Sequence, residues 1–196
     1  MTDIILGIDP GSRVMGYAVL TEDNGKLIAL RCDVLRLAHI EQHSDRLNVI
    51  FDEVSKLLSS INPTSCAIET PIYGVDPQAM LKLGRAQAAA ILAIKQQKRS
   101  VEEYYPKEVK KSITGNGNAS KEQVAYMLDK MVRLPDEKLP NDATDALAVA
   151  WCHYMNIKGA KTRKQTHQNN KKGGWEAFVA ENPNRLKSWY GIWKEA

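Results

Sequence analysis

Cysteine is scarce in this chain of 196 residues, which contains only three. Cys32, Cys66 and Cys152 form no C-x-x-C pair, and their number is odd. The sequence therefore indicates neither a zinc knuckle nor a disulfide framework. We expect buried thiols in a reducing compartment.

Long apolar segments are also absent. No apolar run is long enough to cross a bilayer, and the first residues, M-T-D-I-I-L-G-I-D, contain no basic leader followed by an apolar signal region. We therefore expect no membrane association and a cytoplasmic location. With 43% hydrophobic and 26% charged residues, the composition is that of a globular protein, and the length fits one domain with an appendage.

The positive charge of the chain is unevenly distributed. The net charge of +4 comes from 27 basic and 23 acidic residues. Residues 1–156 hold 18 basic and 20 acidic residues, a net charge of −2, whereas residues 157–196 hold 9 and 3, a net charge of +6. We therefore predict a folded domain at 1–156, a basic flexible linker at 157–174 without a core of its own, and an aromatic, basic helical tail at 175–196.

Hydrophobic periodicity predicts a mixed α/β architecture. Three short strands come first and form an antiparallel meander, with a tight turn at Asp23-Asn24-Gly25. An amphipathic helix, a strand parallel to the first, an almost wholly apolar helix, a fifth strand and further helices follow, and Ser120 with Gln123 is a capping box that starts one of these helices. The apolar helix implies burial on more than one side, as in a subunit interface. This order predicts a mixed five-stranded sheet flanked by helices. The expected bounds are 4–9, 14–20, 26–37, 65–70 and 101–105 for the strands, 79–97 for the apolar helix and about 141–154 for the last helix.

Four acidic residues stand where these elements begin or end. Asp9 ends the first strand in L-G-I-D-P-G-S-R, and Glu69 lies near the end of the fourth in A-I-E-T-P. Asp142 and Asp145 are three positions apart in N-D-A-T-D-A-L, so they share one helix face. Each alone fits a turn, a strand end or a helix start. Asp145, however, directly precedes the apolar run A-L-A-V-A, and a charge at the mouth of a buried helix needs a partner.

Convergence of these four carboxylates at one end of the sheet would be unfavourable unless cations were bound. Oxygen ligands without a His or Cys motif beside them favour Mg²⁺ or Mn²⁺ over zinc. Two such ions about 3.5 to 4 Å apart are the usual arrangement for in-line displacement at a phosphodiester. The acidic set therefore indicates a metal-dependent enzyme that acts on phosphate esters.

Six motifs follow one another between about residues 3 and 155: L-G-I-D-P-G-S-R-x-x-G-Y, A-I-E-T, M-L-K-L-G-R-A-Q, Y-x-P-K-E-V-K, T-G-N-G-N-A-S-K-E-Q-V and D-A-T-D-A-L-A-V-A-x-C-H. In this order they resemble the motifs of the RuvC-type Holliday junction resolvases. The resemblance implies a ribonuclease H-like fold and a homodimer that nicks two opposed strands of four-way junction DNA during recombination and repair. It also implies that Asp9, Glu69, Asp142 and Asp145 are the catalytic residues and hold two Mg²⁺ ions, for which Mn²⁺ would substitute. A branch-migration motor complex is a candidate partner.

The same resemblance implies a set of DNA contacts. Lys110 and Lys121 match family positions that face the scissile phosphates, and Lys121 adds its charge at a helix start. Gly115 and Gly117 would allow the backbone to approach a phosphate closely. Without the motif match, both lysines would be interpreted as solvated helix residues.

Two further regions depart from the family pattern. Many members have an aromatic wedge three positions after the catalytic glutamate, where this chain has Ile72 followed by Tyr73, and either could insert between bases. Lys82 and Arg85 are candidate phosphate contacts. The family often reads G-Q-A-R where this chain reads G-R-A-Q, so either Arg85 or Gln87 could meet the DNA backbone.

Other interpretations of the chain remain open at this stage. A ribosomal-RNA-maturing nuclease of the related YqgF type shares the first motif, and a junction-binding protein without cleavage activity is the non-enzyme alternative. An actin-like kinase needs two such domains, and this chain has room for one. His39 and His43 are expected to be solvated because a third metal ligand is missing, and Cys152 is expected to be a buried thiol instead of a nucleophile.

Overall fold

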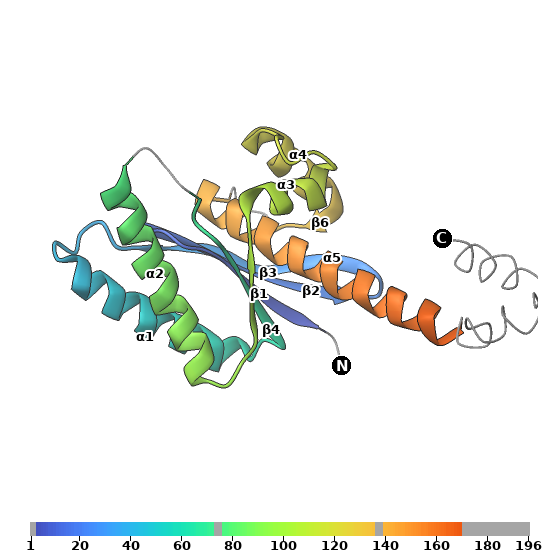
Figure 1. The fold of residues 1–196 in the computed structure, drawn as a ribbon, viewed down its shortest axis with the longest axis horizontal. Coiled ribbons are helices and arrows are strands. Elements are labelled where there is room, and N and C mark those ends of the chain that lie inside the picture. Colours follow the sequence, from blue (N-terminus) through green and yellow to red (C-terminus); the bar gives the residue numbers. More distant parts are fainter. Residues whose placement is uncertain (1–2, 73–75, 136–138, 170–196) are drawn as a thin grey trace, which may run out of the picture. The chain divides into compact units, whose positions relative to one another are not determined.

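A mixed six-stranded sheet forms the centre of the fold (Figure 1). The computed structural model describes residues 3–72, 76–135 and 139–169. The strands are β1 (Ile4–Asp9), β2 (Val14–Asp23), β3 (Lys26–Arg36), β4 (Ser65–Glu69), β5 (Val101–Tyr104) and β6 (Val132–Arg133). Their order across the sheet is β5-β4-β1-β2-β3-β6.

The directions of the strands bring several strand ends to one edge. β1, β2 and β3 form the predicted antiparallel meander, in which Asn24 and Gly25 make the second turn with positive φ angles of 49° and 78°. β4 runs parallel to β1, and β5 runs parallel to β4. The carboxyl ends of β1, β4 and β5 therefore lie at the same edge of the sheet.

The prediction of five strands was wrong by one strand. Val132 and Arg133 form β6, which pairs in parallel with Leu27 and Ile28 of β3. Two residues are too few to produce the apolar and polar alternation that identifies a strand in a sequence. The mixed α/β class with flanking helices was predicted correctly.

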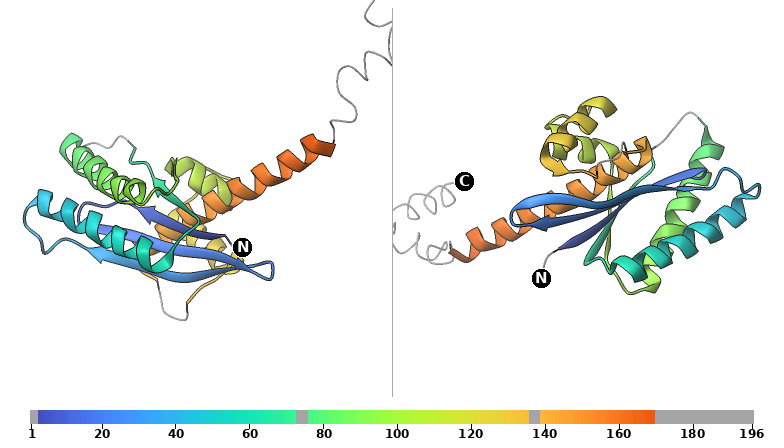
Figure 2. Two further views of the ribbon diagram at one scale, coloured as in Figure 1. Left: turned by 90° about the horizontal axis from the view of Figure 1, so that it is seen from below. Right: turned by 180° about the vertical axis from the view of Figure 1, so that it is seen from behind.

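Five helices complete the described residues. They are α1 (His43–Ile61), α2 (Pro77–Gln96), α3 (Pro106–Thr114), α4 (Lys121–Met131) and α5 (Asn141–Asn169). Figure 2 shows α1 and α2 on one face of the sheet and α3, α4 and the start of α5 on the other. None of the helices in the described ranges is long and apolar enough to cross a membrane.

The last helix is longer than the sequence suggested. α5 continues to Asn169, whereas its end was expected at about Tyr154. The added turns contain no proline, so their polar composition alone does not stop a helix. Met1–Met155 form one compact unit. The linker at 157–174 and the tail at 175–196 stay predictions, and residues 170–196 lie outside the described part of the chain.

Alternation along the strands assigns one set of side chains to each face of the sheet. Leu6 and Ile8 of β1 and Ile68 of β4 belong to the buried core that also includes Leu58 of α1 and Ala90 of α2. Successive residues of a strand point to opposite faces. Gly7, Asp9 and Glu69 therefore face the side of the sheet that carries α5.

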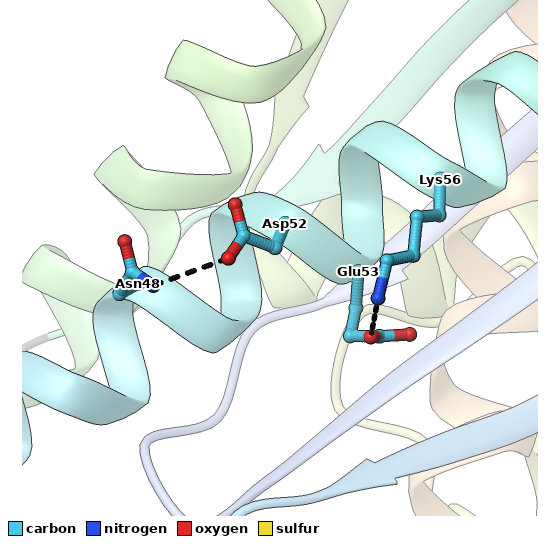
Figure 3. A network of polar contacts seen from close by, with 4 residues as sticks. All are labelled: Asn48, Asp52, Glu53 and Lys56. Carbon is cyan, nitrogen blue, oxygen red and sulfur yellow. Dashed lines mark hydrogen bonds and ion pairs between the residues drawn. The ribbon is translucent and has the colours of Figure 1, made fainter.

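The outer face of α1 is polar and solvated. Asn48 donates a hydrogen bond to Asp52 at 3.1 Å, and Lys56 forms an ion pair with Glu53 at 2.7 Å (Figure 3). Contacts of this kind between exposed side chains on a helix surface contribute little to the stability of a fold. This face provides charged residues that are unrelated to the acidic cluster.

Candidate active site

Asp9 and Glu69 lie side by side at the carboxyl edge of the sheet. Ile8 of β1 and Ile68 of β4 are partners in the parallel ladder, so the residue that follows each of them stands at the same level. Both acidic side chains point to the α5 face, where they are half-buried. Sequence alternation and parallel pairing together produce this arrangement.

Two glycines set the position of α5 on the strands. A Cβ atom added to Gly16 of β2 would lie 1.9 Å from the carbonyl oxygen of Asp142. One added to Gly7 of β1 would lie 2.4 Å from the carbonyl oxygen of Ala146 and 2.8 Å from the Cβ of Ala150. The helix backbone therefore packs directly against the sheet, and Asp142 and Asp145 in its first turns lie over the ends of β1 and β4.

The four carboxylates interact strongly with one another. Burial raises the pKa of Asp9 to about 8, and the charges of Glu69, Asp145 and Asp142 add to this increase. Burial likewise raises the pKa of Glu69 to about 7, with a further contribution from Asp145. Lys121 partly opposes both shifts. The structure thus brings together all four predicted acidic residues.

A lysine supplies the positive charge closest to this cluster. Lys121 Nζ forms an ion pair with Asp145 Oδ2 at 2.5 Å. The hydrogen bond to Asp145 raises the pKa of Lys121, and Asp9 and Asp142 contribute as well. Ser120 caps the start of α4 together with Gln123 in the predicted capping box. The cap fixes the position of Lys121 as the first residue of the helix.

The chemistry of the donor set fits a hard divalent cation. Asp9 and Glu69 are half-buried beside two further carboxylates, and a cation would relieve the repulsion that adds to the effect of burial on their pKa values. The side chains are not closed around one point, however: among the described residues no three His, Cys, Asp or Glu side chains form a ready-made metal site. Lys121 instead neutralises Asp145.

A pocket of about 270 Å³ opens beside the acidic cluster. Glu69, Asp145, Lys121 and Lys110 line it together with the exposed Ile72. Anionic and cationic groups thus meet in one cleft, where the lysines could hold a phosphate against the carboxylates. The structure places both predicted lysines and Ile72 at the site.

The remaining predicted contacts lie on α2, at the end of α3 and the turn that follows it, or outside the described residues. Lys82 and Arg85 are exposed on α2, and Tyr73 belongs to the segment that the structure does not describe. Gly115 ends α3 in the left-handed conformation, with φ of 76°. A Cβ on Gly117 would lie 3.0 Å from the carbonyl oxygen of Lys107, so the turn is packed there.

The structure answers the question raised by G-R-A-Q. Gln87 is buried, and its Nε2 donates a hydrogen bond to Glu103 at 2.8 Å. Arg85 is exposed. Of these two residues, Arg85 is therefore the one that is open to a ligand.

The histidines and cysteines differ in part from the expectations. His39 is exposed, but His43 is half-buried, and burial followed by Arg85, Lys82 and Arg46 lowers its pKa. The prediction of a solvated His43 was therefore wrong. Cys152 is 1% exposed and burial raises the pKa of its thiol, which confirms the buried thiol.

Sequence reasoning missed one buried polar pair. The hydroxyl of Tyr104 and Nδ1 of His153 are 2.9 Å apart in a hydrogen bond. The two residues are 49 positions apart and belong to a strand and a helix, so no local motif could have linked them. His153 is 5% exposed.

A larger hollow of about 670 Å³ lies away from the acidic cluster. It is lined by the turn after β2, the end of α4, β6 and part of α5, including Lys26, Arg133 and Trp151. Among the described residues, Asp129 is the only carboxylate in its lining. By size alone, this hollow would be the candidate active site. Its side chains, however, lack the set of oxygen ligands that the smaller pocket has.

Two comparisons with known sequences point to the same family. Residues 5–153 match the family model described as "Crossover junction endodeoxyribonuclease RuvC". The chain is 42% identical over 183 residues to the Salinibacter ruber protein of that name, covering 93% of this chain and 98% of the relative. It is 43% identical over 185 residues to the protein of the same name from Cytophaga hutchinsonii, covering 94% and 88%.

Solved structures show the same fold. "T. thermophilus RuvC in complex with Holliday junction substrate" superposes with a TM-score of 0.75 and 28% identity, over 81% of this chain and 96% of that one. The yeast mitochondrial Holliday junction resolvase Ydc2 superposes with a TM-score of 0.61 over 76% and 77% of the two chains. At 15% identity, the second likeness concerns the fold alone.

Proposed function

The chain belongs to the RuvC family of crossover junction endodeoxyribonucleases, and from this premise we propose that it resolves four-way DNA junctions by paired hydrolytic nicks. The observation that carries the proposal is the convergence of Asp9 and Glu69 with the α5 carboxylates in an acidic cluster flanked by lysines. Hydrolysis with water as nucleophile would leave 5′-phosphate ends, as the family resemblance implies.

Asp9, Glu69, Asp142 and Asp145 are proposed to hold two Mg²⁺ ions, for which Mn²⁺ would substitute. Such ions supply an activated water and stabilise the charge that develops on the leaving oxygen. The chain's own part is to bring carboxylates from two strands and one helix to the same edge of the sheet. Their raised pKa values support this role, because an uncompensated acidic cluster disfavours its own ionisation.

The basic residues around the pocket are proposed to bind DNA. Lys110 and Lys121 stand beside Glu69 and Asp145 in the cleft and are suited to hold the scissile phosphate. Lys121 would exchange its ion pair with Asp145 for a phosphate when the carboxylate gains another cation.

Further contacts are proposed along the strand path. Lys82 and Arg85 would bind phosphates from α2, and Gly115 and Gly117 would let the backbone approach the DNA. Ile72 is 54% exposed at the pocket and is proposed as the wedge, or shares that role with Tyr73.

A homodimer is proposed because one outer face of α2 is apolar and uncovered. Leu81 and Leu92 are 61% and 62% exposed, and Ala88 between them is exposed as well. These residues are spaced by seven and four positions, so they lie on one side of the helix. A second copy of the chain would cover this side and supply the second active site that paired nicks require.

A branch-migration motor as a partner and a cytoplasmic location of the protein are also proposed.

A nicking assay tests the function. The wild type is expected to cut a synthetic four-way junction in Mg²⁺ but not in EDTA, and to leave a linear duplex of the same sequence uncut. Asp9→Asn and Asp145→Asn should each lower the single-turnover rate at least about 100-fold, because each removes a carboxylate from the cluster. Lys56→Met, on the solvated face of α1, serves as the charge-change control.

Three outcomes would contradict the proposal. Equal cutting of junction and duplex would overturn the structure selectivity, and undiminished cutting by Asp145→Asn would overturn the metal assignment. Cutting of a ribosomal RNA precursor in preference to the junction would favour the YqgF-type alternative.

A further inference from the structure

The edge strand next to Glu69 is held to helices on both faces of the sheet. β5 has four residues, lies at the end of the sheet, and pairs with β4 alone. In this pairing Tyr104 stands opposite Glu69, and the backbone N–H of Thr70 donates a hydrogen bond of 2.9 Å to the carbonyl oxygen of Tyr104. The last residue of β5 is thus the direct neighbour of a proposed metal ligand.

On the α5 face, Tyr104 reaches the helix that carries the other carboxylates. Its hydroxyl and Nδ1 of His153 are 2.9 Å apart, and their rings are 5.8 Å apart. His153 follows Asp145 by eight residues, which is about 12 Å along a helix. Burial lowers the pKa of His153, which favours the neutral ring in this bond, although Glu102 acts in the opposite direction. Because a tyrosine hydroxyl can donate or accept, either imidazole tautomer permits the bond.

On the opposite face, Glu103 ties the same strand to α2. Its Oε2 accepts hydrogen bonds from Gln87 Nε2 at 2.8 Å and from Thr70 Oγ1 at 3.3 Å. Gln87 is 9% exposed, and a buried amide keeps such a partner. Strand alternation explains why adjacent residues, Glu103 and Tyr104, serve opposite faces.

We propose that Tyr104 and His153 are positioning residues that fix the separation between Glu69 on β4 and Asp145 on α5. This proposal rests on the proposed function, since the separation matters because both carboxylates bind metal. Glu69 and Asp145 belong to different elements, and their own side chains do not set the distance between them. The Tyr104–His153 bond joins the strand pair of Glu69 to the helix of Asp145 on the metal-binding face.

Partners behind metal ligands commonly change metal affinity 10- to 100-fold when they are removed. Tyr104 acts on Glu69 less directly, through the β4–β5 ladder. A smaller change in metal affinity, roughly 3- to 10-fold, is therefore expected. A purely structural bond would change thermal stability without changing metal affinity. The two roles can therefore be separated by experiment.

The test measures Mn²⁺ binding to the full chain without DNA, by electron paramagnetic resonance of free Mn²⁺, together with thermal unfolding. Tyr104→Phe keeps the ring and removes only the hydroxyl, and it is expected to raise the Mn²⁺ dissociation constant roughly 3- to 10-fold. The matched control is Tyr105→Phe at the adjacent, 57% exposed tyrosine, which should leave the constant unchanged. His153→Gln should weaken binding in the same way, and the double variant should be no weaker than either single variant.

Unchanged Mn²⁺ affinity in Tyr104→Phe, whatever its melting temperature, would overturn the positioning role while leaving the proposed function intact. An equal loss in Tyr105→Phe would also overturn it. Absence of Mn²⁺ binding by the wild type would overturn the proposed metal site and this inference with it.

Discussion

Single residues of the acidic cluster have opposing effects on stability and on the proposed chemistry. Burial and the neighbouring carboxylates raise the pKa of Asp9 to about 8, whereas the pKa of an isolated aspartate is about 4. Between these values the folded, metal-free chain binds more protons than the unfolded chain. Its free energy of unfolding therefore falls as the pH rises through this window.

Asp9→Asn should stabilise the metal-free chain at high pH. The substitution removes a charge that is buried beside Glu69, so the melting temperature in EDTA at pH 8 is expected to rise by about 3–6 °C. At pH 5, where wild-type Asp9 is protonated, the two proteins should differ little. The control Asp52→Asn, on the solvated face of α1, should show no such pH-dependent gain. A melting temperature at or below that of the wild type at pH 8 would contradict the shift.

Residue positions near strand ends were predictable, and their long-range partners were not. The strand ends were enough to predict that Asp9 and Glu69 stand at the same end of the sheet. The Lys121–Asp145 pair spans 24 positions and the Tyr104–His153 pair spans 49, and each depends on how two elements pack. Local patterns contain no information about such packing.

At the scale of elements, the contact between α5 and the sheet decides where two of the carboxylates stand. Gly16 meets the backbone of Asp142, and Gly7 meets the backbone of Ala146 and Ala150. A side chain at either glycine would push the helix away. The helix start is therefore positioned by the absence of side chains on the strands below it.

Gly16→Ala tests this contact. The added methyl group would overlap the carbonyl oxygen of Asp142, so the free energy of unfolding is expected to fall by about 1–3 kcal/mol and junction cutting with it. The matched control is Gly159→Ala in α5, where an added Cβ has nothing within 4 Å. Helix propensity predicts a gain of about 0.5–1 kcal/mol there. Urea unfolding measures both, and equal effects of the two changes would refute the packing argument.

Elements with strong end signals were predicted well from the sequence. The Ser120–Gln123 capping box marked the start of α4, and the Asp23-Asn24-Gly25 turn marked the β2–β3 hairpin. β6 was missed because two residues have no periodicity. α5 is longer than expected because polar residues without a proline do not end a helix.

At the scale of the whole molecule, the uncovered face of α2 predicts the oligomeric state. Leu81→Glu and Leu92→Glu should convert a dimer to a monomer, because each buries a charge in the proposed interface. Light scattering after size exclusion measures the mass. Leu30→Glu, at a leucine that is 56% exposed on β3, is the control and should leave the dimer intact. Dimers of both α2 variants would exclude this face.

The basic terminal segment predicts the salt dependence of DNA binding. Deletion of 157–196 removes nine basic and three acidic residues, so binding should weaken and depend less on salt. Residues 175–196 hold three basic and three acidic residues, so the positive charge of the segment lies in 157–174 and the tail itself is not basic, contrary to the expectation. Deletion of 175–196 alone should therefore leave the salt slope unchanged. Fluorescence anisotropy at several salt concentrations measures the slope. An unchanged slope after the larger deletion would favour a packing or partner role for the segment.

The backbone contacts of Gly7 and Gly16 also fix the rotational phase of α5. Side chains can repack so that a helix turns about its axis, but two backbone contacts spaced along the helix allow a single phase. One inserted residue between Asp142 and Ala150 would rotate one part of the helix against the other by about 100°. If Ala150 kept its contact with Gly7, Asp142 and Asp145 would no longer stand over Asp9 and Glu69. The spacing from the aspartates to the alanines is therefore as restricted as the identity of the aspartates themselves.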